Sequence, residues 1–378
     1  MNRTCVDNPA GHDGDMTLAA WPVFGPQPRD ELADLTTARL STMPLPAPPA
    51  MAAAPAPGAF EIVDGRGVYV RRVEGPVDAT PAWYIHGLGG SSTNWTRLAA
   101  VLAATNPGYI VDLPGSGRSD PPPRGRYSVT DDADLVAALI RRVSGGPVHL
   151  LGNSMGGVVA TALAARHRDL VSSLTLISPA VPDLRLGRDR GADARLAVVM
   201  VPGITSAAER RLAAVDAMAR ARGMAVVCFG DPAGVTEEDL EVAAADLAWR
   251  SGLPWALRST IFSLRALIRS YLRPGRWSFA AAARAVRVPT LVMWGTRDKL
   301  VDVRLAQPTS ALFPDGRLLV IAGSGHVAQM EHPGLTAAAV AALWEDADAA
   351  PRIGRHPAAP TTGAPQPNRD PAVATSTA

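Results

Sequence analysis

The fold is decided by the stretch Val148-His-Leu-Leu-Gly-Asn-Ser-Met-Gly-Gly157, in which a short apolar run is followed directly by a serine between glycines. The run Val148–Leu151 has the length and composition of a buried strand, and the alanine-rich segment Met155–Arg166 favours a helix. The intervening Gly-Asn-Ser-Met-Gly has the spacing G-x-S-x-G. The sequence therefore predicts a strand, a sharp turn and a helix, with Ser154 exposed at the turn.

The glycines around Ser154 have a physical purpose. A sharp strand-to-helix turn forces its central residue into a strained backbone conformation, and small neighbours let the strand and the helix approach each other. The serine oxygen then lies beside the positive end of the helix, where negative charge is favoured. A glycine-rich turn with an incidental serine is the alternative, and the strand–helix context weighs against it. We interpret Ser154 as a nucleophile.

Short apolar runs bounded by turn residues recur along the chain. They are Ala82–Ile85, Gly108–Val111, Leu174–Ile177, Thr290–Trp294 and Arg317–Ile321. A hairpin is indicated across Asp64-Gly-Arg-Gly67, and helical spacing is found in Val136–Val143 and Leu335–Trp344. Such runs suit strands that are buried on both faces, and their alternation with helices predicts an α/β fold with a parallel sheet.

Residues 181–286 interrupt this alternation, since Ala225–Phe229 is their only strand-like run. The clearest helical stripe there consists of Leu264, Leu267, Ile268, Tyr271 and Leu272, with Arg265, Arg269 and Arg273 on the opposite face. A helical insertion of this length predicts a cap over the site. For the stripe, ordinary core packing is the favoured interpretation, and a stripe that partly faces an apolar substrate pocket is the alternative.

The two ends differ in composition from the centre. Residues 1–57 are rich in proline and alanine, and we interpret them as an N-terminal extension. It contains a helix-like segment, Arg29–Leu40, and an apolar stretch, Trp21–Phe24, and the sequence does not decide whether these dock. Residues 349–378 lack apolar periodicity, so we predict a disordered tail.

Composition excludes several classes of protein. The 378 residues are 47% apolar, which excludes wholesale disorder, and their net charge of +2 argues against a nucleic-acid partner. Two cysteines exclude a disulfide scaffold. The first residues lack the apolar core of a signal peptide, and the uncharged residues 41–60 carry too many prolines for a spanning helix. We expect a soluble, cytoplasmic protein without a membrane span.

A nucleophilic serine needs a base, and a carboxylate that orients the base. Of seven histidines, His326 follows the run Arg317–Ile321 and so leaves the same sheet edge as Ser154. Asp298 follows Thr290–Trp294 at that edge. The rival carboxylates are Asp302, which is better placed to start the next helix, and Asp183. The chain order Ser154, Asp298, His326 is that of an α/β-hydrolase triad.

Two backbone N–H groups are needed to stabilise an oxyanion. Met155 at the start of the helix is one candidate, and Leu88 in the loop His86-Gly-Leu-Gly-Gly90 is the other. That loop lacks the spacing of a dinucleotide fingerprint or a P-loop, so a phosphate-binding role is discounted.

Together these motifs resemble the α/β-hydrolase superfamily over residues 58–348. The matching motifs are His86–Gly90, Asp112-Leu-Pro-Gly-Ser-Gly-Arg-Ser119, Gly152–Gly157, Trp294–Asp298 and Gly323–His326. The resemblance implies eight mostly parallel strands with helices on both faces, a helical cap after the sixth strand, and no metal or organic cofactor. Its serine motif is similar to those of esterases and of C–C bond hydrolases that act on ring-cleavage products. Serine at position 154, where dehalogenases and epoxide hydrolases carry aspartate, speaks against those two activities.

We therefore predict a core formed by residues 58–180 and 287–348, a helical cap at 181–286, and a serine hydrolase that cleaves small apolar esters or acyl compounds through an acyl-enzyme. C–C bond hydrolysis is an alternative reaction. A non-catalytic ligand-binding protein is an alternative from another class.

Overall fold

The computed structural model describes residues 30–183, 214–275 and 278–349. Its eight strands form one sheet in the order β1-β2-β4-β3-β5-β6-β7-β8. The strands are β1 (Gly58–Val63), β2 (Arg66–Val73), β3 (Ala82–Ile85), β4 (Gly108–Val111), β5 (Val148–Asn153), β6 (Val171–Ile177), β7 (Thr290–Gly295) and β8 (Gly316–Ile321). β2 pairs antiparallel with β1 and with β4, and the other neighbours are parallel. The predicted eight-stranded, mostly parallel sheet is confirmed.

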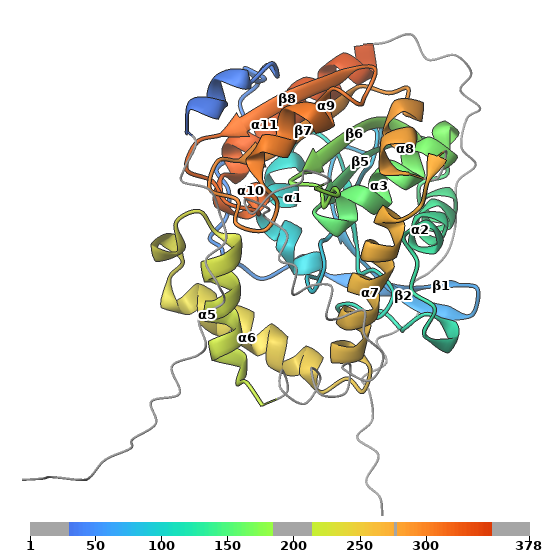
Figure 1. The fold of residues 1–378 in the computed structure, drawn as a ribbon, viewed down its shortest axis with the longest axis vertical. Coiled ribbons are helices and arrows are strands. Elements are labelled where there is room, and N and C mark those ends of the chain that lie inside the picture. The colour runs from blue at the N-terminus through green and yellow to red at the C-terminus, as the bar shows by residue number, and fades with distance from the viewer. Residues whose placement is uncertain (1–29, 184–213, 276–277, 350–378) are drawn as a thin grey trace, which may run out of the picture.

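Helices cover both faces of the sheet (Figure 1). One face carries α2 (Val129–Val143), α3 (Met155–Arg166) and α8 (Phe279–Ala285), and the other carries α1 (Thr96–Leu102) and α11 (Pro333–Ala349). The short helices α9 (Ala306–Ser310) and α10 (Ala328–Glu331) precede and follow β8. Each face of the sheet has its own hydrophobic core: the first core lies under α2, α3 and α8, and the second lies under α1 and α11. Along β3, Trp83 packs into the first core and Tyr84 into the second, because successive strand residues point to opposite faces. Burial on both faces explains why the strands are continuous apolar runs.

Three helices lie between β6 and α8 in the described part of the chain. They are α5 (Ala217–Cys228), α6 (Glu237–Ser251) and α7 (Ala256–Tyr271). The strand-like run Ala225–Phe229 was a wrong prediction, since it is the last turn of α5. Its Ala225 and Phe229 share a small core with Leu240 of α6, so helix packing accounts for the apolar run.

The stripe on α7 packs mainly on the core of the sheet domain. Leu267 is buried in the first core, and the Tyr271 hydroxyl donates to the carbonyl oxygen of Ala180 at 2.8 Å. Leu272 is 74% exposed, contrary to the stripe prediction, because it is the cap residue beyond the last turn of the helix. The packing interpretation therefore describes the buried part of the stripe.

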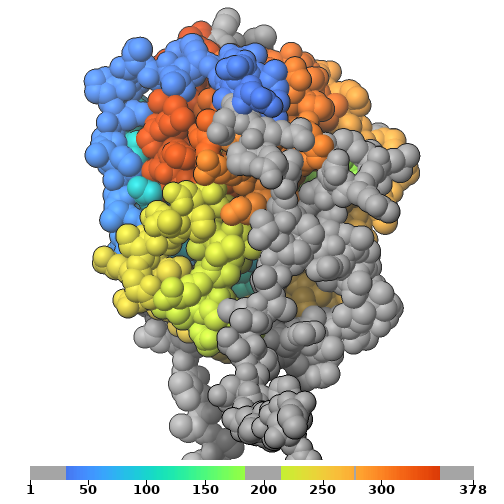
Figure 2. Space-filling view, turned by 60° about the vertical axis from the view of Figure 1, so that its left-hand side comes forward, coloured from blue at the N-terminus to red at the C-terminus, as the bar shows by residue number. Residues whose placement is uncertain are grey.

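The N-terminal extension docks on the edge strand β8. A 3₁₀ helix (Asp30–Leu35) replaces the expected helix Arg29–Leu40, and the chain then runs beside β8. The N–H groups of Thr37 and Ala38 donate to Leu318 O at 2.8 and 2.9 Å, and Val320 N–H donates to the hydroxyl of Thr36 at 3.0 Å. Figure 2 shows this blue segment against the orange and red C-terminal elements. Trp21–Phe24 and the predicted tail from residue 350 lie outside the described residues.

Among the helices that the structure describes, none has both the length and the apolar character needed to cross a membrane.

Candidate active site

Ser154 lies at a strained turn between β5 and α3. Its backbone has φ 54° and ψ −121°, in the region of positive φ that residues other than glycine rarely adopt. A Cβ on Gly152 would lie 2.4 Å from Gly156 O, and one on Gly156 would lie 2.3 Å from Ile85 O. The two glycines are therefore required because strand and helix backbones touch at this turn.

The loop after β3 passes directly beside Ser154. A Cβ on Gly87 would lie 3.0 Å from the Cβ of Ser154. The half-buried Leu88 follows in this loop, and Met155 is the first residue of α3. The first N–H groups of a helix have no acceptor within the helix, so the Met155 amide remains able to donate. The two residues expected to supply oxyanion donors thus flank the serine on two neighbouring elements.

Asp298 and His326 are brought together by the loops after β7 and β8. His326 Nδ1 lies 2.9 Å from Asp298 Oδ2, and both residues are 4% exposed. The other oxygen of Asp298 accepts from the N–H groups of Leu300 and Val301 at 2.9 and 3.0 Å. This carboxylate is consequently fixed in position while it holds one nitrogen of the histidine ring.

The rival carboxylates have other surroundings. Asp302 caps the 3₁₀ helix Val303–Leu305, since it accepts from Arg304 N–H at 2.9 Å and pairs with the guanidinium of that residue. This agrees with the expected role at the start of a helix. Asp183 is the last residue described before the gap at 184–213.

Two further described histidines, His149 and His167, have side-chain partners away from Ser154. His149 lies within β5, bonds Ser173 Oγ at 2.8 Å and stacks on Trp344. His167 lies 2.7 Å from a carboxylate oxygen of Asp134. His12 and His356 lie outside the described residues.

His86 and Arg250 hold the loop that carries Leu88, and sequence reasoning assigned neither of them this role. His86 is fully buried, its Nε2 accepts from Leu113 N–H at 3.0 Å, and its Nδ1 therefore donates to Gly87 O at 2.7 Å. Burial lowers the pKa of His86, so the neutral ring is favoured. From α6, Arg250 donates to Gly89 O at 3.0 Å. The loop is thus tied to the sheet on one side and to α6 on the other.

The loop of His326 is tied to the end of α5. His326 N–H donates to Cys228 O at 2.7 Å. Glu331 accepts from Gly325 N–H with one oxygen and from Gly230 N–H with the other, each at 2.8 Å. Burial raises the pKa of the Glu331 carboxyl. Figure 1 shows the upper end of α5 reaching toward α10, the helix that ends at Glu331.

Lys299 makes a similar connection from the Asp298 loop. Its ammonium donates to the carbonyl oxygens of Val226 and Phe229 at 2.8 and 3.1 Å. A cation is favoured at the C-terminal end of a helix, where carbonyl groups lack partners. Both loops of the Asp298–His326 pair are therefore attached to one end of α5. Nothing local in the sequence marks Glu331 or Lys299 for this role.

No group of three or more His, Cys, Asp or Glu residues suited to a metal ion occurs within the described ranges. The loop of His326 is tied to the serine turn by Asn153, the residue before Ser154, whose amide donates to His326 O at 3.1 Å.

The chain is similar in sequence to several curated proteins. A dihydrolipoyllysine-residue acetyltransferase component of the acetoin cleaving system from Pseudomonas putida is 29% identical over 67% of this chain, and the match spans 60% of that protein. A pimeloyl-[acyl-carrier protein] methyl ester esterase from Neisseria meningitidis is 30% identical, with 70% of this chain and 75% of the relative covered. A 2-hydroxy-6-oxononadienedioate/2-hydroxy-6-oxononatrienedioate hydrolase from Burkholderia vietnamiensis is 27% identical, with 66% and 81% covered.

The family follows from a match to a family model. The family model described as alpha/beta hydrolase fold matches residues 84–333, which include the turn at Ser154 and the Asp298–His326 pair. The observed strand order and the strained serine turn agree with that match. The chain belongs to the alpha/beta hydrolase family.

Proposed function

We propose that the protein is a serine hydrolase that cleaves carboxylic esters or related acyl substrates through an acyl-enzyme. The observation that carries the proposal is the buried Asp298–His326 pair at 2.9 Å, on the same sheet edge as the strained Ser154. A histidine held in this way by a carboxylate keeps its proton on Nδ1, so Nε2 is left with a lone pair to act as a base.

The proposed reaction proceeds in two halves. Ser154 Oγ attacks the acyl carbon while His326 Nε2 takes the hydroxyl proton, and the N–H groups of Leu88 and Met155 stabilise the oxyanion. His326 then gives this proton to the leaving alcohol, which departs as the acyl-enzyme forms. Water repeats the sequence on the acyl-enzyme and releases the acid. Each oxyanion donor contributes a factor of about 10²–10³ in kcat in enzymes of this type.

Ester hydrolysis is preferred because one relative that is 30% identical, with 70% of this chain and 75% of the relative covered, is a methyl ester esterase. C–C bond hydrolysis is the second candidate, and the hydrolase from Burkholderia vietnamiensis favours it. The helices of the segment α5–α7 would act as the cap over the pocket. A protein that only binds its ligand has no need of an oriented histidine, so the pair weighs against that alternative.

Labelling with a fluorophosphonate probe tests the nucleophile. We expect one adduct on Ser154, found by peptide mass spectrometry, and none in Ser154→Ala. Ser178→Ala is a matched control, since Ser178 is also at positive φ (43°), at the end of the neighbouring strand. An adduct on Ser178, or no adduct in the folded protein, would contradict the proposed nucleophile.

The reaction class is tested with two substrate sets on one preparation. For an esterase with an apolar pocket, kcat/KM on nitrophenyl esters should rise from acetate to about butanoate or hexanoate, since each buried methylene contributes about 0.8 kcal/mol. Negligible hydrolysis of all esters, together with rapid bleaching of a dienol ring-cleavage product, would contradict the proposed ester hydrolysis and favour C–C bond hydrolysis.

A further inference from the structure

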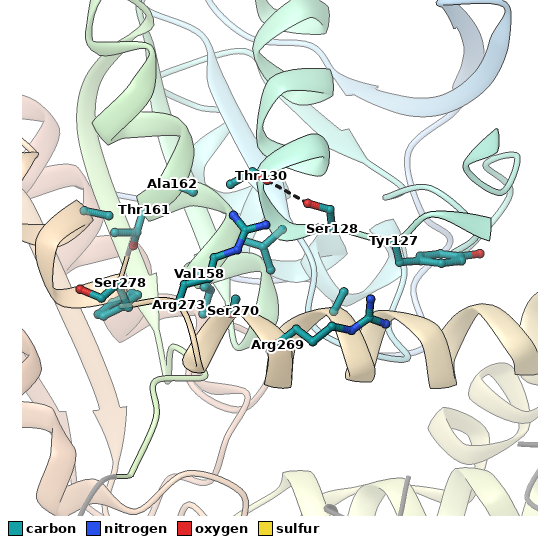
Figure 3. Close-up of a pocket in the computed structure, with 14 residues that line it drawn as sticks. Tyr127, Ser128, Thr130, Val158, Thr161, Ala162, Arg269, Ser270, Arg273 and Ser278 are labelled. Carbon is teal, nitrogen blue, oxygen red and sulfur yellow. Dashed lines mark hydrogen bonds between the residues drawn. The ribbon is translucent and has the colours of Figure 1, made fainter. Parts of the chain in front are cut away.

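A cavity of about 110 Å³ lies away from the serine site, between α2, α3, α7 and α8 (Figure 3). It is lined by 14 residues, and Ser154, Asp298 and His326 are not among them. A cavity of roughly 150 Å³ can hold benzene, so this space suits a small organic group of a few carbon atoms. The cavity is therefore large enough for a ligand and separate from the proposed chemistry.

The rim of the cavity carries positive charge without a compensating carboxylate. Arg269 in the last turn of α7 and Arg273 just beyond the end of that helix are both lining residues, and the 14 include no aspartate or glutamate. In Figure 3 the Arg273 side chain reaches toward Thr130, and the Arg269 side chain lies along α7 on the side of Tyr127. Within the described part of the chain, neither guanidinium forms an ion pair. Two guanidinium groups at one cavity that has no acidic lining residue favour binding of an anion.

Hydroxyl groups add further donors at the same rim. Ser278 Oγ accepts from Ala281 N–H at 3.2 Å, so its own hydrogen is left to donate. Ser128 Oγ and Thr130 Oγ1 are 2.8 Å apart and share one hydrogen, which leaves the second hydrogen of this pair for a ligand. The rim thus offers guanidinium and hydroxyl donors.

The floor of the cavity is apolar. Its side chains are those of Val129, Val158, Ala162, Ala266, Phe279 and Ala282. An inorganic anion would leave this surface in contact with water, whereas a short hydrocarbon chain would cover it and gain about 0.8 kcal/mol per buried methylene. The lining therefore matches an anion that has an alkyl end.

We infer that this cavity binds a short-chain carboxylate of about four to six carbons, with the carboxylate between Arg269 and Arg273 and the chain on the floor. The planar guanidinium group pairs with a carboxylate through two parallel N–H···O bonds, which favours this anion. The inference does not depend on the proposed catalysis, because the lining and the serine site share no residue.

The test is titration of the full chain with hexanoate, followed by calorimetry. In the double variant Arg269→Gln/Arg273→Gln we expect the Kd for hexanoate to rise at least about tenfold. Arg265→Gln is the matched control, since Arg265 is one turn earlier on α7 and outside the lining. Hexanamide, which has the chain without the charge, should not bind measurably.

A second variant tests the floor without changing charge. Ala162→Leu should block hexanoate binding, while the rate of nitrophenyl butanoate hydrolysis and the melting temperature confirm a folded protein. Unchanged hexanoate affinity in the arginine double variant would overturn the inference, because the acid would then occupy the serine site only. Equal binding of hexanamide, or tighter binding of inorganic phosphate than of hexanoate, would overturn the assigned ligand class.

Discussion

Replacing Asp298 by asparagine changes one atom and tests the orientation of His326. The carboxylate accepts from two backbone N–H groups, those of Leu300 and Val301, with Oδ1, and it faces His326 Nδ1 with Oδ2. An asparagine side chain has one acceptor oxygen and one donor NH₂ group, so it can satisfy only one of these two sides. The question is which orientation the amide adopts.

The backbone decides the orientation. Turning the amide so that NH₂ faces the two N–H groups would leave two buried donors unsatisfied, at about 1–3 kcal/mol each. The total of roughly 2–6 kcal/mol keeps the oxygen beside Leu300 and Val301 in at least about 95% of molecules. The NH₂ group then faces His326, which must accept with Nδ1 and carry its proton on Nε2. In that tautomer His326 cannot take the proton of Ser154.

We therefore expect Asp298→Asn to lower kcat by about 10⁴ with little change in melting temperature. The assay is hydrolysis of nitrophenyl butanoate, together with thermal unfolding. Asp302→Asn is the matched control: it removes a buried carboxylate four residues away that caps a helix, so it should affect stability more than kcat. A folded Asp298→Asn enzyme with kcat within tenfold of wild type would refute the assigned role.

Three further predictions concern parts of the structure outside the reacting groups. Deleting residues 1–41 should lower the melting temperature by several degrees, because it removes the hydrogen bonds to β8. Deleting residues 1–29 keeps these bonds and is the control. Equal melting temperatures for the two truncations would show that the docked segment does not stabilise the fold. Glu331→Gln should lower kcat about tenfold with KM little changed, since an amide can accept from only one of the N–H groups of Gly325 and Gly230; an unchanged kcat would exclude a positioning role. Burial, with the charge of Asp131 adding to it, raises the pKa of Asp132 to about 7, so the stability that its protonation contributes is present below about pH 4 and is lost as the pH rises to about 7. Asp132→Asn stays neutral and should therefore raise the melting temperature more at pH 8 than at pH 5, and an equal effect at both pH values would contradict the raised pKa.

The sheet and the Asp298–His326 pair could be predicted from the sequence for topological reasons. Strands buried on both faces must be apolar throughout, and the carboxyl ends of parallel strands meet at one edge. Residues that follow different strands are thereby brought together although 28 positions separate Asp298 from His326. The same reasoning distinguished Asp298 from Asp302, which starts the next helix.

The errors arose where contacts, rather than local patterns, determine structure. An apolar run of five residues suits either a buried strand or the buried face of a helix, and packing against α6 makes Ala225–Phe229 helical. The extension docks through the hydroxyls of Thr36 and Thr37 and through the partly buried Leu32 and Leu35, and so short an apolar pattern does not indicate docking in the sequence. Arg250 and Gly89 are 161 positions apart in the sequence, and they come into contact only when the helical segment is folded against the sheet domain.

The attachment of α5 to the loops of Asp298 and His326 limits how the protein can open. If α5 lifted away from the sheet, either the bonds from His326 N–H to Cys228 O and from Gly230 N–H to Glu331 would break, or the loop of His326 would be displaced together with the helix. An opening motion that leaves the proposed site intact must therefore keep this end of α5 fixed, so that the fixed end serves as the pivot. Access would come from α6, where release of the bond between Arg250 and Gly89 would free the Leu88 loop at the same time. Entry of substrate and assembly of the oxyanion site would then be coupled through a single arginine.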